Sequence, residues 1–404
     1  MKWNKSGRAL ASLALLAAGS VTVLATGSGL ASAAKAKSTI LIGNQADLTG
    51  NATVGIPGNY GVQFAIKQIN AHGGLDGHKL KLYTADSQFS ATGGIASARQ
   101  LVESDHVSII VNTSASDALI PSLPVIQAAH VPMIVAAGSD PEIVLPSNTY
   151  AFISPAVPVN VDVLAYLKYM KKVGYTSVAV IYPSEDLGNV ETADLQDDAA
   201  AYGITFTTMQ GYTIGTTDFS SQISAAQATK PQAVFDIGDA LGNVYKQALQ
   251  VGFNVPFMFD ADATDPLLIN SLGASVANGV VSFQTQATQL LDATTPPMTT
   301  WIKEFDAAFP SAPTGVPSQF SLEGYEATFV AADAILNVLT EKRTVTGPHL
   351  VTALNHITGF TEGKTAFKYA VPIAYPVTFT PTDHAGDSTV TPVVVKNGIW
   401  APIG

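Results

Sequence analysis

Short runs of β-branched and apolar residues alternate with amphipathic segments along most of this chain, and this alternation limits the possible folds more than any other feature. Residues 107–143 show it clearly. Val107–Val111 predicts a strand, Asp117–Ala129 predicts a helix, and Val131–Ala136 predicts a second strand. Strands that alternate with helices are typical of βαβ units around a parallel sheet. The sequence therefore predicts an α/β protein.

Small polar residues fill the loops that follow these two predicted strands. Residues 112–116 (NTSAS) lead into the helix, and residues 137–140 (AGSD) follow the second strand. Both loops would lie at the carboxyl ends of parallel strands, where open α/β sheets bind ligands. Serines beside a helix N-terminus can hold a carboxylate, but serine is also a common helix cap. The residues alone leave both interpretations open.

The alternation of strands and helices occurs twice. It runs from Thr39 to about residue 150, stops over an uncharged, proline-containing segment at 150–160, and restarts over residues 161–283. In the restarted part, Ser177–Tyr182 predicts a strand and Gly188–Tyr202 predicts a helix. This order predicts two similar α/β lobes with a linker between them.

The remaining chain predicts two further crossings between the lobes. Residues 286–300 are rich in Thr and Pro, and three helices follow. The chain ends in predicted strands at Val377–Thr380 and Pro392–Lys396 and closes on the hairpin signal Asn397-Gly398. The lobe boundaries that we predict are residues 38–155 plus 286–375 for the N-terminal lobe and 156–285 plus 376–404 for the C-terminal lobe. The three predicted helices span residues 299–309, 319–339 and 347–357.

The first 33 residues have the organisation of a Sec-type signal peptide. Lys2, Lys5 and Arg8 precede an apolar run, and small residues follow up to Ala33. Glycine and serine interrupt this run before it reaches the roughly 20 apolar residues of a membrane span. We therefore expect residues 1–33 to be removed during export and the mature protein to be periplasmic or extracellular.

Composition argues against several classes of protein. The chain has no cysteine, so thiol catalysis, cysteine-based metal sites and a lipid anchor on cysteine are not expected. Its 20 Lys and Arg against 31 Asp and Glu disfavour nucleic acid and anionic membranes as partners. The seven His are scattered, and no Walker A, G-x-S-x-G or G-x-G-x-x-G motif occurs. We expect no catalysis, no metal and no cofactor.

Several segments resemble the type I periplasmic solute-binding proteins of ABC importers, in particular the branched-chain amino-acid (Leu/Ile/Val)-binding family. The most specific is Gly61–Gly77, GVQFAIKQINAHGGLDG, which is similar to the family's A-I-x-x-I-N-x-x-G-G-x-x-G. Weaker matches are Leu48-Thr49-Gly50, Val131–Ile134, Asp186-Leu187-Gly188 and Thr217–Ser220. The resemblance covers essentially all of residues 38–404. It implies two Rossmann-like lobes, three crossings between them and a ligand cleft between the lobes.

The resemblance also implies ligand-binding residues on the first lobe. The family holds the carboxylate of an amino acid at a helix N-terminus, and this role falls on Ser116, with Ser114 and Ala115 beside it. The second loop of this lobe would offer the backbone carbonyl of Ala137 and the hydroxyl of Ser139.

On the second lobe, the family uses an acidic residue after a strand to bind the ligand ammonium group. Asp260 and Asp262 are both candidates, and they could instead be solvated loop acids. Leu187 stands where an aromatic wall is common, and Asp239 lies in a loop that is often aromatic. These departures favour a polar or cationic amino acid, or a small amide-bearing solute, over a plain branched-chain amino acid.

We therefore expect an exported, monomeric protein that captures an amino acid or a similar small polar solute. The resemblance implies that it delivers this solute to an ABC-type membrane permease. The alternative is a ligand sensor on the same fold that docks a signalling receptor, and the sequence leaves this choice open.

Overall fold

The computed structural model describes residues 37–238, 240, 242–264, 266–285, 296–361, 366–370, 376–386 and 390–403. The predicted signal peptide, Asp239 and most of the predicted crossing at 286–300 lie outside these residues. In the part of the chain that is described, no helix combines the length and the apolar character needed to span a membrane.

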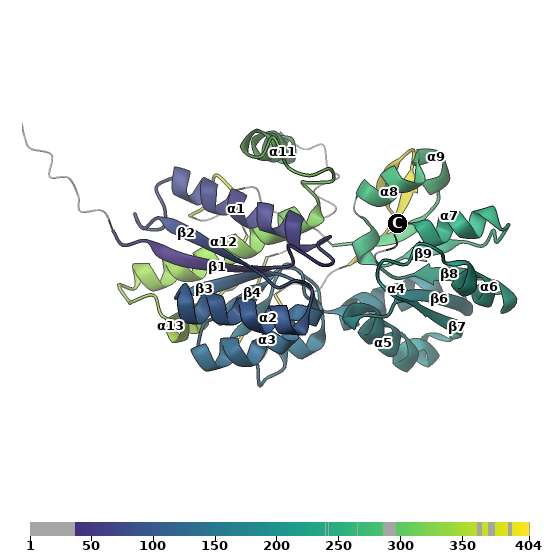
Figure 1. Cartoon of the computed structure of the whole chain (residues 1–404), viewed down its shortest axis with the longest axis horizontal. Coiled ribbons are helices and arrows are strands. Elements are labelled where there is room, and N and C mark those ends of the chain that lie inside the picture. The colour runs from purple at the N-terminus through teal and green to yellow at the C-terminus, as the bar shows by residue number, and fades with distance from the viewer. Residues whose placement is uncertain are drawn as a thin grey trace, which may run out of the picture. The chain divides into compact units, whose positions relative to one another are not determined.

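The first sheet contains five parallel strands in the order β2-β1-β3-β4-β5 (Figure 1). The strand β3 is buried along its whole length, as expected of a parallel sheet that helices cover on both faces. The strands are β1 (Ile40–Ala46), β2 (Leu80–Asp86), β3 (Ile109–Thr113), β4 (Met133–Val135) and β5 (Ala151–Ile153).

Helices cover both faces of this sheet. One face packs against α1 (Gly55–Ala71), α12 (Gln319–Thr340) and α13 (Gly347–Leu354), and α11 (Pro296–Ala308) joins the same hydrophobic cluster through Phe64 of α1. The other face packs against α2 and α3. These helices are α2 (Ala91–Arg99), its π-helical continuation η1 (Gln100–Ser104) and α3 (Ser116–Ala129), and a short 3₁₀ turn, η2 (Pro141–Val144), precedes β5.

Facing glycines let α1 and α12 approach closely. A Cβ atom on Gly61 would lie 1.9 Å from the carbonyl oxygen of Ser321, and one on Gly324 would lie 2.3 Å from that of Gly58. Neither glycine can therefore be replaced without moving a helix backbone. The contact fixes the first turns of α12 against α1.

The second sheet contains seven strands in the order β12-β11-β10-β9-β8-β6-β7. The strands β6 to β10 pair in parallel, while β11 and β12 form an antiparallel hairpin at one edge, turning at the predicted Asn397-Gly398. The strands are β6 (Ser177–Pro183), β7 (Thr205–Tyr212), β8 (Ala233–Asp236), β9 (Phe257–Phe259), β10 (Val281–Gln284), β11 (Thr391–Lys396) and β12 (Ile399–Pro402).

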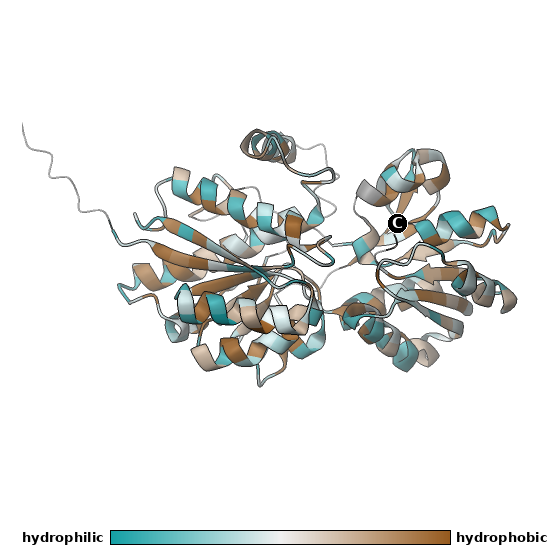
Figure 2. Ribbon diagram, viewed as in Figure 1, coloured by the Kyte–Doolittle hydropathy of each residue, from teal (hydrophilic) through white to brown (hydrophobic). Residues whose placement is uncertain are grey.

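This sheet is also covered on both faces. Tyr166 of α4 and Leu195 of α5 belong to the cluster on one face, and the remaining helices pack on the other. Figure 2 shows hydrophobic residues concentrated on the strands and hydrophilic residues on the outer sides of the helices. The helices are α4 (Val159–Val173), α5 (Asp186–Tyr202), α6 (Ser220–Ala228), α7 (Asn243–Gln250), η3 (Ala261–Thr264), α8 (Pro266–Leu272) and α9 (Ala274–Ala277).

The chain passes between the two sheets three times: after β5, between β10 and α11, and before β11. The predicted fold class, with two α/β lobes and three crossings, is thereby confirmed. The segment at 150–160, predicted as a linker, contains the strand β5, because Ala151-Phe152-Ile153 is apolar and completely buried.

One predicted lobe boundary differs from the structure. Val377 and Phe379 are buried in the cluster of the first sheet, and Ala385 bridges to Ile153 of β5. Residues 376–386 therefore pack with the first sheet, although we assigned them to the C-terminal lobe. The predicted strand at 377–380 forms only isolated bridges. The other lobe boundaries stay a prediction.

Candidate functional site

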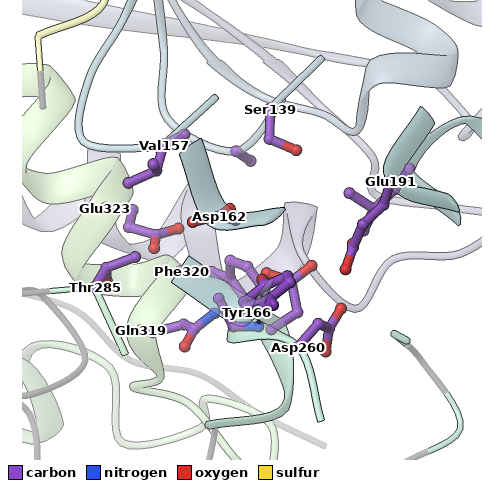
Figure 3. A pocket seen from close by; sticks show the side chains of 15 residues that line it. Ser139, Val157, Asp162, Tyr166, Glu191, Asp260, Thr285, Gln319, Phe320 and Glu323 are labelled. Carbon is purple, nitrogen blue, oxygen red and sulfur yellow. Dashed lines mark hydrogen bonds between the residues drawn. The ribbon is translucent and has the colours of Figure 1, made fainter. Parts of the chain in front are cut away.

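Residues from both sheets line one pocket (Figure 3). Ala137 and Ser139 follow β4, and Asp260 follows β9, so these residues lie at carboxyl ends of parallel strands. The helices α4, α5 and α12 and the first crossing complete the wall. The other lining residues are Ala156, Val157, Asp162, Tyr166, Leu187, Glu191, Ala261, Asp262, Thr285, Gln319, Phe320 and Glu323.

The space inside the pocket is small. Its volume is about 40 Å³, which holds only a few water molecules. A larger solute can enter only if the lining residues move apart.

The pocket is strongly acidic. Among the described residues that line it, five are carboxylates and none is Lys, Arg or His. These carboxylates are Asp162, Glu191, Asp260, Asp262 and Glu323. Within the described residues, no three His, Asp or Glu side chains are grouped in a way that could hold a metal ion.

Two of these carboxylates are buried without full hydrogen bonding. Glu191 is 1% exposed and Asp162 is 8% exposed, and one carboxylate oxygen of each has no hydrogen-bond partner among the described residues. Burial raises the pKa of Asp162 well above its usual range, and Asp262 raises it further. Burial also raises the pKa of Glu191, with added repulsion from Asp260 and Asp162. Both groups therefore favour the protonated form when no cation is near.

The loop after β9 is held in place by hydrogen bonds to its neighbours. The backbone N–H of Gly238 donates to Oδ2 of Asp260 at 3.0 Å, and the N–H of Ala261 donates to the Tyr166 hydroxyl at 3.1 Å. Burial and the nearby carboxylates hold the pKa of Tyr166 well above its usual range, so its phenol keeps its proton. These contacts present Asp260 to the pocket from a fixed backbone.

The predicted carboxylate site at the start of α3 already contains a carboxylate of the protein. The backbone N–H of Ala115 donates to Oδ2 of Asp47 at 2.8 Å, and the hydroxyl of Ser87 donates to Oδ1 at 2.6 Å. The hydroxyls of Ser114 and Ser87 lie 2.6 Å apart, and both side chains are buried. Ser114 and Ala115 thus belong to a hydrogen-bond network around Asp47.

Ser116 also contacts protein carboxylates. Its hydroxyl accepts a hydrogen bond from the backbone N–H of Asp140 at 3.4 Å and donates one to the carboxyl group of Asp186. The N–H of Asp186 donates to Oδ1 of Asp117 at 3.3 Å. Burial, followed by repulsion from Asp140 and Asp117, raises the pKa of Asp186 to about 6.

The structure brings together some of the sequence-predicted site residues. Ala137, Ser139, Leu187, Asp260 and Asp262 all line the pocket. By contrast, Ser114, Ala115 and Ser116 are not among the lining residues, and Asp239 lies outside the described residues.

Apart from Leu187, the lining residues supplied by α-helices were not predicted as site residues from the sequence. Asp162, Glu191 and Glu323 carry no local motif, and Tyr166 was expected only in the core, where it is indeed buried. Asp162 and Glu323 lie in the first two turns of helices, and α4 directly follows a crossing. An acidic residue in the first turns of a helix that follows a crossing was the only sequence feature that could have indicated these site residues.

A family model described as "Periplasmic binding protein" matches residues 39–398. An "Amino acid binding protein" of Pseudomonas aeruginosa is 25% identical over 265 residues, which cover 65% of this chain and 71% of that protein. The Leu/Ile/Val-binding protein of Escherichia coli is 23% identical over 226 residues, which cover 55% of this chain and 61% of that protein. The chain thus matches about three fifths of the length of the second relative.

Solved structures share the fold. The branched-chain amino acid transporter substrate-binding protein LivJ of Streptococcus pneumoniae, in complex with isoleucine, has a TM-score of 0.75 at 18% identity, covering 90% of this chain and 97% of that one. A leucine-binding protein, LivK, of Thermotoga maritima has a TM-score of 0.72 at 18% identity, covering 91% and 98%.

The named relatives are binding proteins, which agrees with the expectation that this chain binds a solute and is not an enzyme. The family model covers the first sheet, the second sheet except β12, and every element that lines the pocket. The chain therefore belongs to the periplasmic binding protein family.

Proposed function

We propose that this chain is an exported solute-binding protein that captures a small polar solute, an amino acid or a similar compound, and delivers it to an ABC-type permease. The observation that carries the proposal is the acidic pocket whose lining residues come from both sheets. The names of the relatives, which bind amino acids, support it.

The pocket suits a protein that changes conformation with its ligand. Ser139 follows a strand of the first sheet, whereas Asp260 and Glu191 belong to elements of the second. A solute that contacts both sets favours the conformation in which they lie close together, which is a population shift driven by binding. Such a conformation can be recognised by a permease.

The proposal includes export. Residues 1–33 would act as a Sec-type signal peptide, and the mature chain, which has no cysteine for a lipid anchor, would work as a monomer outside the cytoplasmic membrane.

Three measurements test the proposal. Mass spectrometry of the mature protein, purified without denaturation, should identify one solute that co-purifies. Adding that solute at about 100 times its Kd should stabilise the protein by about 2.7 kcal/mol, seen as a rise in Tm. Replacing Phe320 in the pocket by Ala should weaken binding, and Lys246→Ala, outside the pocket, should not.

Uptake assays separate import from sensing. Cells that lack the gene for this chain should lose high-affinity uptake of the same solute, whereas loss of a sensor would change a response and leave uptake intact. The proposal is wrong if no solute co-purifies and no amino acid, amide or amine raises the Tm.

A further inference from the structure

We infer that the solute of this pocket is a small organic cation without a carboxylate, such as an amine or a diamine. This inference depends on the proposed function and narrows its solute class. It departs from the α-amino acids named in the relatives, each of which carries a carboxylate beside its ammonium group.

The charge of the pocket lining is the first reason. Figure 3 shows Glu191 and Asp260 toward one side of the pocket and Glu323 toward the other, with Asp162 between them. No basic side chain is among the described lining residues. The carboxylates of Asp162, Glu191, Asp260 and Asp262 repel one another. A bound cation removes that repulsion.

The burial of two carboxylates is the second reason. Asp162 and Glu191 are more than nine-tenths buried, and each has an oxygen without a hydrogen-bond partner among the described residues. A buried carboxylate is costly unless it meets a positive charge and hydrogen-bond donors. An ammonium group supplies both, with three N–H donors.

The absence of room for a ligand carboxylate is the third reason. At the start of α3, the Ala115 N–H binds the carboxylate of Asp47 and the Ser116 hydroxyl binds that of Asp186. A carboxylate of the solute would have to replace one of these groups and would then face Asp117 and Asp140. A cation that lacks a carboxylate avoids this repulsion.

Binding of such a cation should release protons. Because Asp162 and Glu191 favour the protonated form in the empty pocket, a cation that pairs with their ionised forms displaces protons into solution. The affinity should therefore rise with pH until both carboxyls are ionised in the empty pocket. The other titratable groups that face these two, Asp260, Asp262 and Glu185, shift the equilibrium in the same direction.

Matched pairs of probes test the inference by isothermal titration calorimetry on the mature protein. Cadaverine and lysine differ only by a carboxylate, as do putrescine and ornithine, agmatine and arginine, and isopentylamine and leucine. We expect at least one amine to bind about 100-fold or more tightly than its carboxylate-bearing partner, a difference typical of a charge placed beside like charges. Repeating the titration in buffers of different ionisation enthalpy should reveal proton release.

Substitutions in the pocket test whether the amine binds beside Glu191 and Asp162. Glu191→Gln should weaken binding of the amine at least about tenfold, because it removes one charge-assisted hydrogen bond. Asp197→Asn is the matched control, since Asp197 is exposed on the same helix, α5. If Glu191→Gln fails to fold, Asp162→Asn provides the same test from α4.

The outcomes separate the inference from the proposed function. Tighter binding of lysine, ornithine, arginine or leucine than of the matched amine overturns the inference but leaves the proposed function intact. Binding of calcium or magnesium and of no amine overturns the inference as well. If neither class binds and no solute co-purifies, both proposals fail.

Discussion

Asp47 and Glu191 are both buried carboxylates, but they differ in how many hydrogen bonds they accept from the described residues. Asp47, which is fully buried, accepts hydrogen bonds from the Ser87 hydroxyl and from the backbone N–H groups of Phe89 and Ala115. Glu191 is buried to a similar degree, but one of its oxygens has no hydrogen-bond partner among the described residues.

The pKa shifts follow from this difference. Burial raises the pKa of both groups. The three donors around Asp47 offset part of this rise, so its pKa stays only raised, whereas the carboxylates near Glu191 add to the effect of burial and hold that pKa well above its usual range. The described residues therefore compensate the charge of Asp47 in part, whereas the charge of Glu191 would be compensated by the cationic solute that we propose. Asp47 fixes the start of α3, while Glu191 can respond to a solute.

Replacing Asp47 should produce the largest loss of stability. Asp47→Ala removes the acceptor of the Ser87 hydroxyl and of the partly buried N–H groups of Phe89 and Ala115, and it should lower the free energy of unfolding by about 3 kcal/mol. Urea denaturation of the mature protein measures this change. Asp306→Ala, an exposed position on α11, is the control and should change stability by less than about 0.5 kcal/mol. A similarly small effect of Asp47→Ala would remove the contrast with Glu191.

Replacing Glu191 should increase the stability of the ligand-free protein, in contrast to replacing Asp47. Because the pKa of Glu191 is raised in the folded protein, this carboxyl costs stability as the pH rises above its ordinary pKa, and Glu191→Gln removes that cost. The ligand-free variant should therefore gain about 2 kcal/mol at pH 8. The gain should be smaller at pH 5, because this pH lies closer to the ordinary pKa of a glutamate. Thermal unfolding at both pH values gives the comparison, with Asp197→Asn as control. A destabilised, correctly folded variant would show that Glu191 is compensated in the empty protein.

Ser114→Ala should affect stability alone. Loss of the buried hydroxyl 2.6 Å from that of Ser87 should cost about 1 kcal/mol, while the affinity for the solute stays within about twofold of the original value. Denaturation and calorimetry together measure the two quantities. A large loss of affinity without a loss of stability would instead support the prediction that Ser114 binds the ligand beside Ser116.

The smallest effect should come from Asp186, which is only partly buried. Because its pKa is raised to about 6 in the folded protein, folding takes up part of a proton between about pH 4 and 6. Its contribution to stability is present below pH 4 and is lost as the pH rises through 6. Asp186→Asn should flatten the pH dependence of stability in this window by at most about one proton. If the stability of Asp186→Asn depends on pH as steeply as that of the original protein, the pKa of Asp186 is not raised.

Elements with strong periodicity could be predicted from the sequence. The helix predicted over residues 188–202 is observed over 186–202, and the strand predicted over 177–182 is observed over 177–183. The short strand β5 was missed, because three apolar residues beside prolines carry no periodicity. Only its burial beside β4 makes it a strand.

The site was predictable where it follows strands. Ala137 and Ser139 could be placed at the carboxyl edge of the first sheet and Asp260 at the carboxyl edge of the second, because each follows a parallel strand. Only the resemblance to binding proteins implied that the two edges face one cleft. Glu191 and Glu323 could not, since they reach the pocket through long-range packing of α5 and α12, which no local pattern encodes.

The close contact between α1 and α12 matters for protein engineering. Because Gly61 and Gly324 cannot accept side chains, the start of α12 is a rigid platform, and exchanges at Phe320 or Glu323 should change the shape and charge of the pocket without disturbing the scaffold. The chain contains no cysteine, so a thiol introduced at exposed Asp197 would be a unique attachment point for a fluorophore. The protein could thus be developed into a fluorescent sensor that needs no added reagent, and substitutions on α12 alone would change which solute it binds.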